Sequence, residues 1–157
     1  MRVLVDTSVW SLALRRDKPV QSPEMMELRR LITAHLVEII GPIRQEVLSG
    51  IRDTIQFDRL EKYLAAFSDL SLHADDYAMA AKFFNLYRAK GIQGSNTDFL
   101  ICAVAVRHDL AIFTPGLDRC SHFHDACLYL YLYVIRPRAR SYGESSRSTR
   151  SPGKMRM

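Results

Sequence analysis

The stretch that decides the fold is residues 96–114, NTDFLICAVAVRHDLAIFT. Its first part, residues 96–108, predicts the most apolar helix of the chain, because the run FLICAVAV at its centre leaves little room for a solvated face. Its second part, LAIFT at residues 110–114, is a short apolar run of the kind that forms a buried strand. A helix that leads directly into a buried strand is typical of α/β proteins, in which helices cover a sheet.

The rest of the chain repeats this alternation of short apolar strands and helical segments. RVLVD at residues 2–6 and LVEII at residues 36–40 predict buried strands, and Ser22-Pro23-Glu24 is a helix start with a hydroxyl N-cap. The alternation predicts an α/β fold with a short parallel sheet flanked by helices, whose functional crevice lies beyond the carboxyl ends of the strands. Further strands are expected at residues 70–72 and 127–135, and helices at residues 9–16, 22–35, 42–49, 54–67 and 74–90.

Length and composition are those of one ordinary globular domain. The chain has 157 residues, of which 48% are hydrophobic and 25% charged, and these values exclude a disordered or fibrous protein. No apolar stretch approaches the ~18–20 residues of a membrane-spanning helix, and the N-terminal MRVLVDTSVW is too short in its apolar part for a signal peptide. The three cysteines are too few for a disulfide scaffold, so we expect a cytoplasmic protein that does not engage a membrane.

The net charge of +5 is concentrated at the C-terminal end. Residues 136–157 hold seven basic residues and one acid, a net charge of +6, whereas residues 1–135 carry a net charge of −1. The C-terminal segment has almost no apolar residues to bury, which is typical of disorder. We therefore expect a folded domain at residues 1–135 and a basic, disordered tail at residues 136–157 that is at most an accessory RNA contact.

Four acids lie after predicted strands or at the start of a helix, and the sheet can bring them together: Asp6, Glu46, Asp98 and Asp118. Carboxylates that converge on one crevice repel one another, and a divalent cation removes that cost. Hard oxygen donors favour Mg²⁺ or Mn²⁺, which keep waters for a nucleophile and positions for substrate phosphates. Because such an ion acidifies bound water and stabilises charge at phosphorus, the pattern predicts metal-dependent phosphodiester hydrolysis.

Each acid also has a structural interpretation. Asp6 can cap the helix that follows it, and Glu46 can be a solvated helix residue. SNTD at residues 95–98 is a capping-box variant that explains Asp98, and Asp118 lies in a polar turn. Only the joint pattern of the four acids favours catalysis over structure.

Three ordered motifs carry a resemblance to a known family. VDTSVW at residues 5–10, PIRQEVLSG at residues 42–50 and SNTDFLICA at residues 95–103 resemble the PIN-domain nucleases, and more narrowly the VapC-type toxins of toxin–antitoxin pairs. The resemblance spans roughly residues 2–114. It implies a PIN-like three-layer sandwich with a short parallel sheet.

The resemblance also implies an activity, a cofactor and partners. The activity is that of a Mg²⁺- or Mn²⁺-dependent endoribonuclease, which a cognate VapB-type antitoxin inhibits by blocking the acidic groove. The substrate is RNA, and a homodimer is implied as well. Asp6, Glu46 and Asp98 match the first three metal-binding acids of the family, Thr7 or Ser8 matches the hydroxyl beside the first acid, and Thr114 matches the hydroxyl before the last acids.

The chain departs from the family pattern after Thr114. The family continues with Asp, one spacer and Asp-Phe, whereas this chain has PGLDR at residues 115–119, so Gly116 takes the fourth-acid position and Asp118 the next one. A frameshift near residue 115 is one hypothesis for the change, and a catalytically impaired PIN-domain binding partner is an alternative function. A haloacid-dehalogenase-like phosphotransferase with Asp6 as nucleophile is a further alternative, although Ser8 stands where that chemistry needs a second Asp.

Residues 120–133 offer two further features. A Cys-x-His-x-His-x-x-Cys group at residues 120–127 resembles a zinc ligand set, although its short spacing favours a structural interpretation. The tyrosines that alternate within residues 129–133 predict an edge strand with one aromatic face, in preference to a platform for stacked bases.

Overall fold

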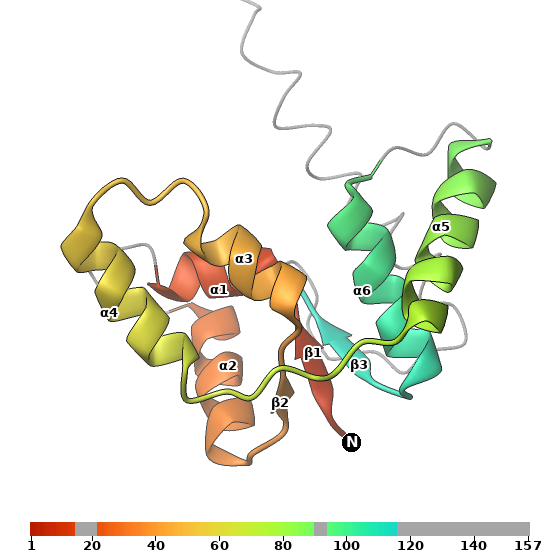
Figure 1. Cartoon of the computed structure of the whole chain (residues 1–157). Coiled ribbons are helices and arrows are strands. Elements are labelled where there is room, and N and C mark those ends of the chain that lie inside the picture. The colour runs from red at the N-terminus through yellow and green to blue at the C-terminus, as the bar shows by residue number, and fades with distance from the viewer. Residues whose placement is uncertain (15–21, 90–93, 116–157) are drawn as a thin grey trace, which may run out of the picture.

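The computed structural model describes residues 1–14, 22–89 and 94–115. Within these residues the chain forms three strands and six helices (Figure 1). In chain order the elements are β1 (Val3–Val5), α1 (Thr7–Leu14), α2 (Pro23–Thr33), β2 (Val37–Glu38), α3 (Gly41–Leu48), α4 (Thr54–Leu64), α5 (Ala74–Arg88), α6 (Asn96–Arg107) and β3 (Ala111–Phe113). Gly116, Asp118, the Cys/His group, the predicted strand at residues 127–135 and the tail lie outside the described residues.

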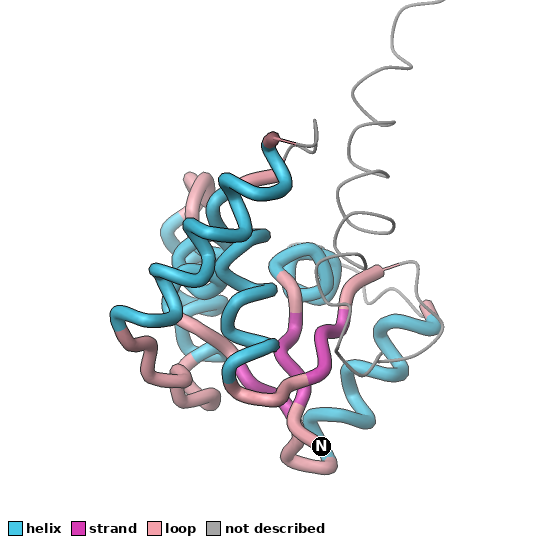
Figure 2. The backbone as a smooth tube through the Cα atoms, turned by 90° about the vertical axis from the view of Figure 1, so that its right-hand side faces the viewer, coloured by secondary structure: helices cyan, strands magenta, loops and turns pink. Residues whose placement is uncertain are grey.

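The sheet is parallel, and β1 is its central strand. The strand order is β2-β1-β3, with Val3 opposite Val37 on one side and Ala111 on the other. Every residue of β1 and β3 is buried, as expected for parallel strands covered on both faces. Figure 2 shows helices on both sides of the strands, and Figure 1 shows α1–α4 to the left of the sheet and α5 and α6 to its right. The predicted α/β sandwich with a short parallel sheet is confirmed.

α6 is the buried helix that the run FLICAVAV predicts. All of its residues from 98 to 105 are buried, and it packs against α5 and β3. This continuous burial explains why the helix shows no polar stripe at its centre. Neither α6 nor any other described helix is long and apolar enough to cross a membrane.

Side-chain caps begin the two helices whose starts the sequence predicts. The Ser22 hydroxyl accepts a hydrogen bond from the Met25 N–H at 3.4 Å at the start of α2, where Pro23 takes the first helical position. Ser95 begins α6 in a capping box with Asp98. Such caps satisfy backbone donors that the first turn of a helix leaves unpaired. Both predicted starts are confirmed.

The predicted strand at residues 70–72 is wrong. The chain forms only an isolated parallel bridge here, between Ile39 and Asp69, and the Leu70 N–H donates to the Ile39 carbonyl at 2.8 Å. The guanidinium of Arg44 on α3 holds the Asp69 carboxylate, with Nη2 2.7 Å from Oδ1. The segment is therefore held by one backbone bridge next to β2 and by an ion pair with α3, without a strand ladder.

A buried carboxylate joins α5 to α6. The Asp76 side chain lies near the start of α5 and accepts hydrogen bonds from the His73 N–H and from Arg107 Nε, both at 2.8 Å, and His108 Nε2 lies 3.1 Å from it. Burial on its own raises the pKa of the Asp76 carboxyl, but these hydrogen bonds and the charge of His108 lower the pKa below its ordinary value of 3.8. A charged Asp76 therefore holds the end of α6 against the start of α5.

We expect Asp76→Asn to lower the free energy of unfolding at pH 7 by about 1–3 kcal/mol, because it removes a charged acceptor shared by two helices. The pKa of Asp76 is lower in the folded state than in the unfolded state. Its contribution is therefore present above the unfolded pKa and is lost as the pH falls through the folded pKa. The difference between wild type and Asp76→Asn should thus shrink below about pH 4, and urea unfolding at pH 7 and pH 3 measures it.

The matched control for this substitution is Asp75→Asn. The Asp75 side chain is 78% exposed and lies 3.5 Å from Arg107, so its loss should change the free energy of unfolding by less than about 1 kcal/mol. An equal loss of stability in both variants would contradict the role given to the buried carboxylate.

Candidate active site

Asp6 lies buried at the carboxyl end of the central strand. Its backbone N–H donates to the Phe113 carbonyl at 2.9 Å, and its carbonyl accepts from the Val9 N–H at 3.1 Å as α1 begins. Its side-chain Oδ2 accepts hydrogen bonds from the hydroxyls of Ser8 and Thr114, the latter at 3.1 Å. Because Thr114 directly follows β3, two neighbouring strands and the start of a helix together set the orientation of the carboxylate.

α3 brings Glu46 to the same end of the sheet. The Thr7 hydroxyl donates to Glu46 Oε2 at 3.1 Å, and Thr7 is buried while Glu46 is half-buried. The neighbouring hydroxyls of Thr7 and Ser8 therefore donate hydrogen bonds to different acids, since Ser8 donates to Asp6. The sequence left these two hydroxyls as alternatives, because adjacent residues in one turn offer the same kind of donor.

Asp98 forms the capping box that the sequence predicts. Its Oδ2 accepts from the Ser95 N–H at 2.9 Å, and the Asp98 N–H donates to Ser95 Oγ at 3.1 Å. The Asp98 side chain is buried at the first turn of α6. A carboxylate has two oxygens with about four lone-pair sites, so capping and metal binding are compatible roles for the same residue.

The residues gathered around Asp6 make up the acidic cluster: Asp6, Thr7, Ser8, Glu46 and Thr114. Within the described residues no group of three or more His, Cys, Asp or Glu side chains is placed to hold a metal ion, and the acidic cluster itself contains two carboxylates, those of Asp6 and Glu46. Mg²⁺ is commonly held by one or two carboxylates, with water and substrate phosphates completing its coordination. The two carboxylates of the acidic cluster are donors of this type.

The family profile described as the PIN domain matches residues 3–119. This span is well over half of the chain and contains the whole described sheet and the acidic cluster. The chain belongs to the PIN domain family. Its α/β sandwich is therefore a PIN fold, and the resemblance carried by the three motifs is confirmed at the level of the family.

Two solved structures share this PIN fold. FitAcB from Neisseria gonorrhoeae is 22% identical with a TM-score of 0.59, and the match covers 71% of this chain and 86% of that chain. VapBC2 from Rickettsia felis, bound to a DNA fragment from their promoter, is 16% identical with a TM-score of 0.59, and the match covers 75% of this chain and 90% of that chain. At these identities the likeness concerns the fold. None of the curated proteins matches the chain.

Two substitutions separate capping from metal binding at the start of α6. Ser95→Ala should lower the free energy of unfolding by about 1 kcal/mol, because the helix loses a cap acceptor, and should leave Mn²⁺ affinity unchanged. Asp98→Asn keeps an oxygen that accepts from the Ser95 N–H, so stability should stay near wild type while Mn²⁺ affinity falls. Urea unfolding in EDTA and calorimetric titration with Mn²⁺ measure the two effects. Wild-type Mn²⁺ affinity in Asp98→Asn would assign Asp98 to capping alone.

Proposed function

We propose that this PIN-domain protein is a Mg²⁺- or Mn²⁺-dependent endoribonuclease and the toxin of a toxin–antitoxin pair. PIN domains are generally nucleases and generally use divalent metal ions. The observation that carries the proposal is the acidic cluster, in which two hydroxyls orient Asp6 at the end of the central strand and a third orients Glu46. One buried and one half-buried carboxylate held in this way suit a hard cation, which can in turn bind the phosphates of a nucleic acid.

The acids and hydroxyls have distinct proposed roles. Asp6 and Glu46 would hold the ion, with Asp98 as a further acid and Asp118 as a fourth from beyond the described residues. A bound Mg²⁺ or Mn²⁺ supplies Lewis-acid stabilisation of the phosphate and a more acidic water. Ser8, Thr114 and Thr7 are positioning residues, because their hydroxyls fix the orientation of the carboxylates that bind the ion.

The proposed partners are RNA as substrate and a cognate VapB-type antitoxin. The VapC-type motifs in the sequence support the antitoxin, and so does the structural likeness to VapBC2. We propose in addition that the protein is a homodimer and acts in the cytoplasm.

We expect the purified full-length protein to cleave single-stranded RNA in Mg²⁺ or Mn²⁺ and to be inactive in EDTA. Asp6→Asn should reduce the cleavage rate by at least about 100-fold, because a charged metal ligand is lost, and Thr114→Val by about 10-fold, because only the orienting hydroxyl is lost. Initial rates on a fluorescent oligonucleotide measure these effects. Asp58→Asn is the control, since it removes an exposed acid of α4 away from the acidic cluster, and it should cleave at the wild-type rate.

Two outcomes would contradict the proposed activity. Cleavage by Asp6→Asn at the wild-type rate would show that the acidic cluster does not bind the catalytic metal. A wild-type protein that is inert in both ions and still binds the antitoxin would favour the catalytically impaired alternative, in which Gly116 takes the place of the fourth acid.

Co-expression with the protein encoded by the adjacent gene should yield a stable complex that does not cleave RNA. The complex should regain cleavage when the partner is removed by denaturation or proteolysis, because inhibition comes from a blocked groove. Affinity purification followed by light scattering measures the complex and its stoichiometry, and light scattering of the isolated protein tests for the homodimer. Unchanged cleavage in the complex would contradict inhibition by this partner.

A further inference from the structure

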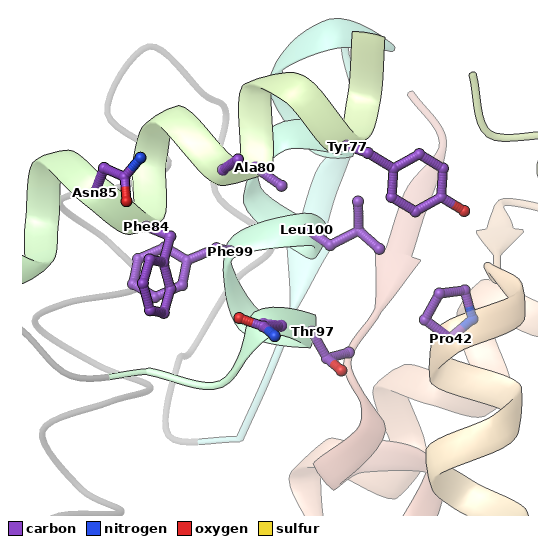
Figure 3. Close-up of a pocket in the computed structure, with 10 residues that line it drawn as sticks. Pro42, Tyr77, Ala80, Phe84, Asn85, Thr97, Phe99 and Leu100 are labelled. Carbon is purple, nitrogen blue, oxygen red and sulfur yellow. The ribbon is translucent and has the colours of Figure 1, made fainter. Parts of the chain in front are cut away.

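A groove of about 410 Å³ lies between the start of α3, α5 and the first turn of α6. Figure 3 shows Tyr77 and Pro42 at one end, Phe84 and Asn85 at the other, and Leu100 between them. The floor of the α5–α6 groove is apolar, because Ala80, Phe99 and Leu100 are buried. Its volume is in the range of pockets that bind small organic groups.

Two residues that line the groove are the sequence neighbours of a proposed metal-binding acid. Thr97 and Phe99 both line it, and Asp98 lies between them in the first turn of α6. The capping box with Ser95 fixes this turn, so groove and acid have a constant relative position. The groove and Asp98 therefore share the first turn of α6, while the Asp98 side chain itself is not among those that line the groove.

An exposed aromatic ring lies at one end of the groove, and a cation lies beside the other end. Tyr77 is 51% exposed, and Phe84 packs edge-on against Phe99 with ring centroids 5.4 Å apart. The guanidinium carbon of Arg88 lies 5.4 Å from the centre of the Phe84 ring, which places a cation at that end. Nucleobases stack on aromatic rings and on guanidinium planes, whereas phosphates pair with guanidinium.

The polar groups of the groove are suited to reading a base edge. Asn85 and Asn96 are exposed and bring carboxamides, each with two donor hydrogens and one acceptor oxygen, and Thr97 adds a hydroxyl. Among the described residues that line the groove none is charged, so no carboxylate within it repels a nucleotide.

We propose that the α5–α6 groove binds one unstacked base of the RNA beside the bond that is cleaved, and that Tyr77, Asn85 and Asn96 determine which base is accepted. The inference rests on the proposed function, because it names a substrate contact of the same site. A second copy of the chain is a less suitable occupant. Of the described lining residues, Tyr77 alone is a strongly exposed large apolar side chain, whereas a stable interface buries about 800 Å² on each partner.

Binding without cleavage tests the groove separately from catalysis. Fluorescence anisotropy in EDTA, with 2′-O-methyl homopolymers of A, C, G and U, should show one preferred base. Tyr77→Ala should weaken binding to that homopolymer by about tenfold, because a stacking surface is lost. Asn85→Ala and Asn96→Ala should reduce the difference among the four homopolymers. Tyr63→Ala is the matched control, since Tyr63 is 59% exposed on α4 and lies outside the groove, and it should bind as wild type does.

Cleavage of RNA with randomised positions, in Mg²⁺, gives the second readout. We expect a base preference at one position beside the cut, and its loss in Asn85→Ala or Asn96→Ala. If wild type does not cleave but binds with a preference that depends on Tyr77, the groove is supported and the nuclease proposal fails. If wild type cleaves while the groove variants keep wild-type affinity and base preference, the groove proposal is overturned. A dimer that Tyr77→Ala converts to a monomer, with RNA binding unchanged, would overturn it in favour of an interface between copies.

Discussion

The burial of Asp6 at the end of β1 is the constraint on which the rest of the site depends. An ionised carboxylate removed from water is costly unless hydrogen bonds or a cation compensate it. Here Thr114, at the end of the neighbouring strand, and Ser8, in the first turn of α1, donate to the same oxygen. Since β1 must pair with β3 for Thr114 to reach Asp6, the geometry of the acid and the register of the sheet are one requirement.

A polar residue of the candidate site can have a structural role and a proposed functional role at the same time. Asp98 caps α6, as its place in the sequence predicts, and the same cap holds a carboxylate at the first turn of the most buried helix. Ser95 in turn determines where that helix begins. The capping role of Asp98 therefore does not exclude a role in metal binding. Substitutions of both Ser95 and Asp98 are needed to separate the effect on stability from the effect on metal affinity.

Much of the fold could be predicted from the sequence, because its signals are local. The apolar run in α6 and the Ser22-Pro23 pair mark elements through burial and capping, which depend on neighbouring residues. The strand expected at residues 70–72 is reduced to a single bridge at Asp69, and the contacts of this segment with Ile39 and Arg44 join parts of the chain that a local pattern does not relate. The four acids could be named and expected near one another, but the choice between Thr7 and Ser8 as hydroxyl donor could not be predicted, since it depends on how α3 packs against α1.

The α5–α6 groove, which we propose as a base-binding site, has no counterpart in the sequence motifs that mark the acids. The acids stand in short sequence motifs: Asp6 follows β1, Glu46 lies on α3 and Asp98 lies in the first turn of α6. The groove is assembled from α3, α5 and α6, and its lining on α5 is spaced over several turns of the helix. Aromatic and carboxamide side chains at such spacing are ordinary in any helix. Their proposed role in binding a base rests on the first turn of α6, which contributes both lining residues of the groove and the capping acid Asp98.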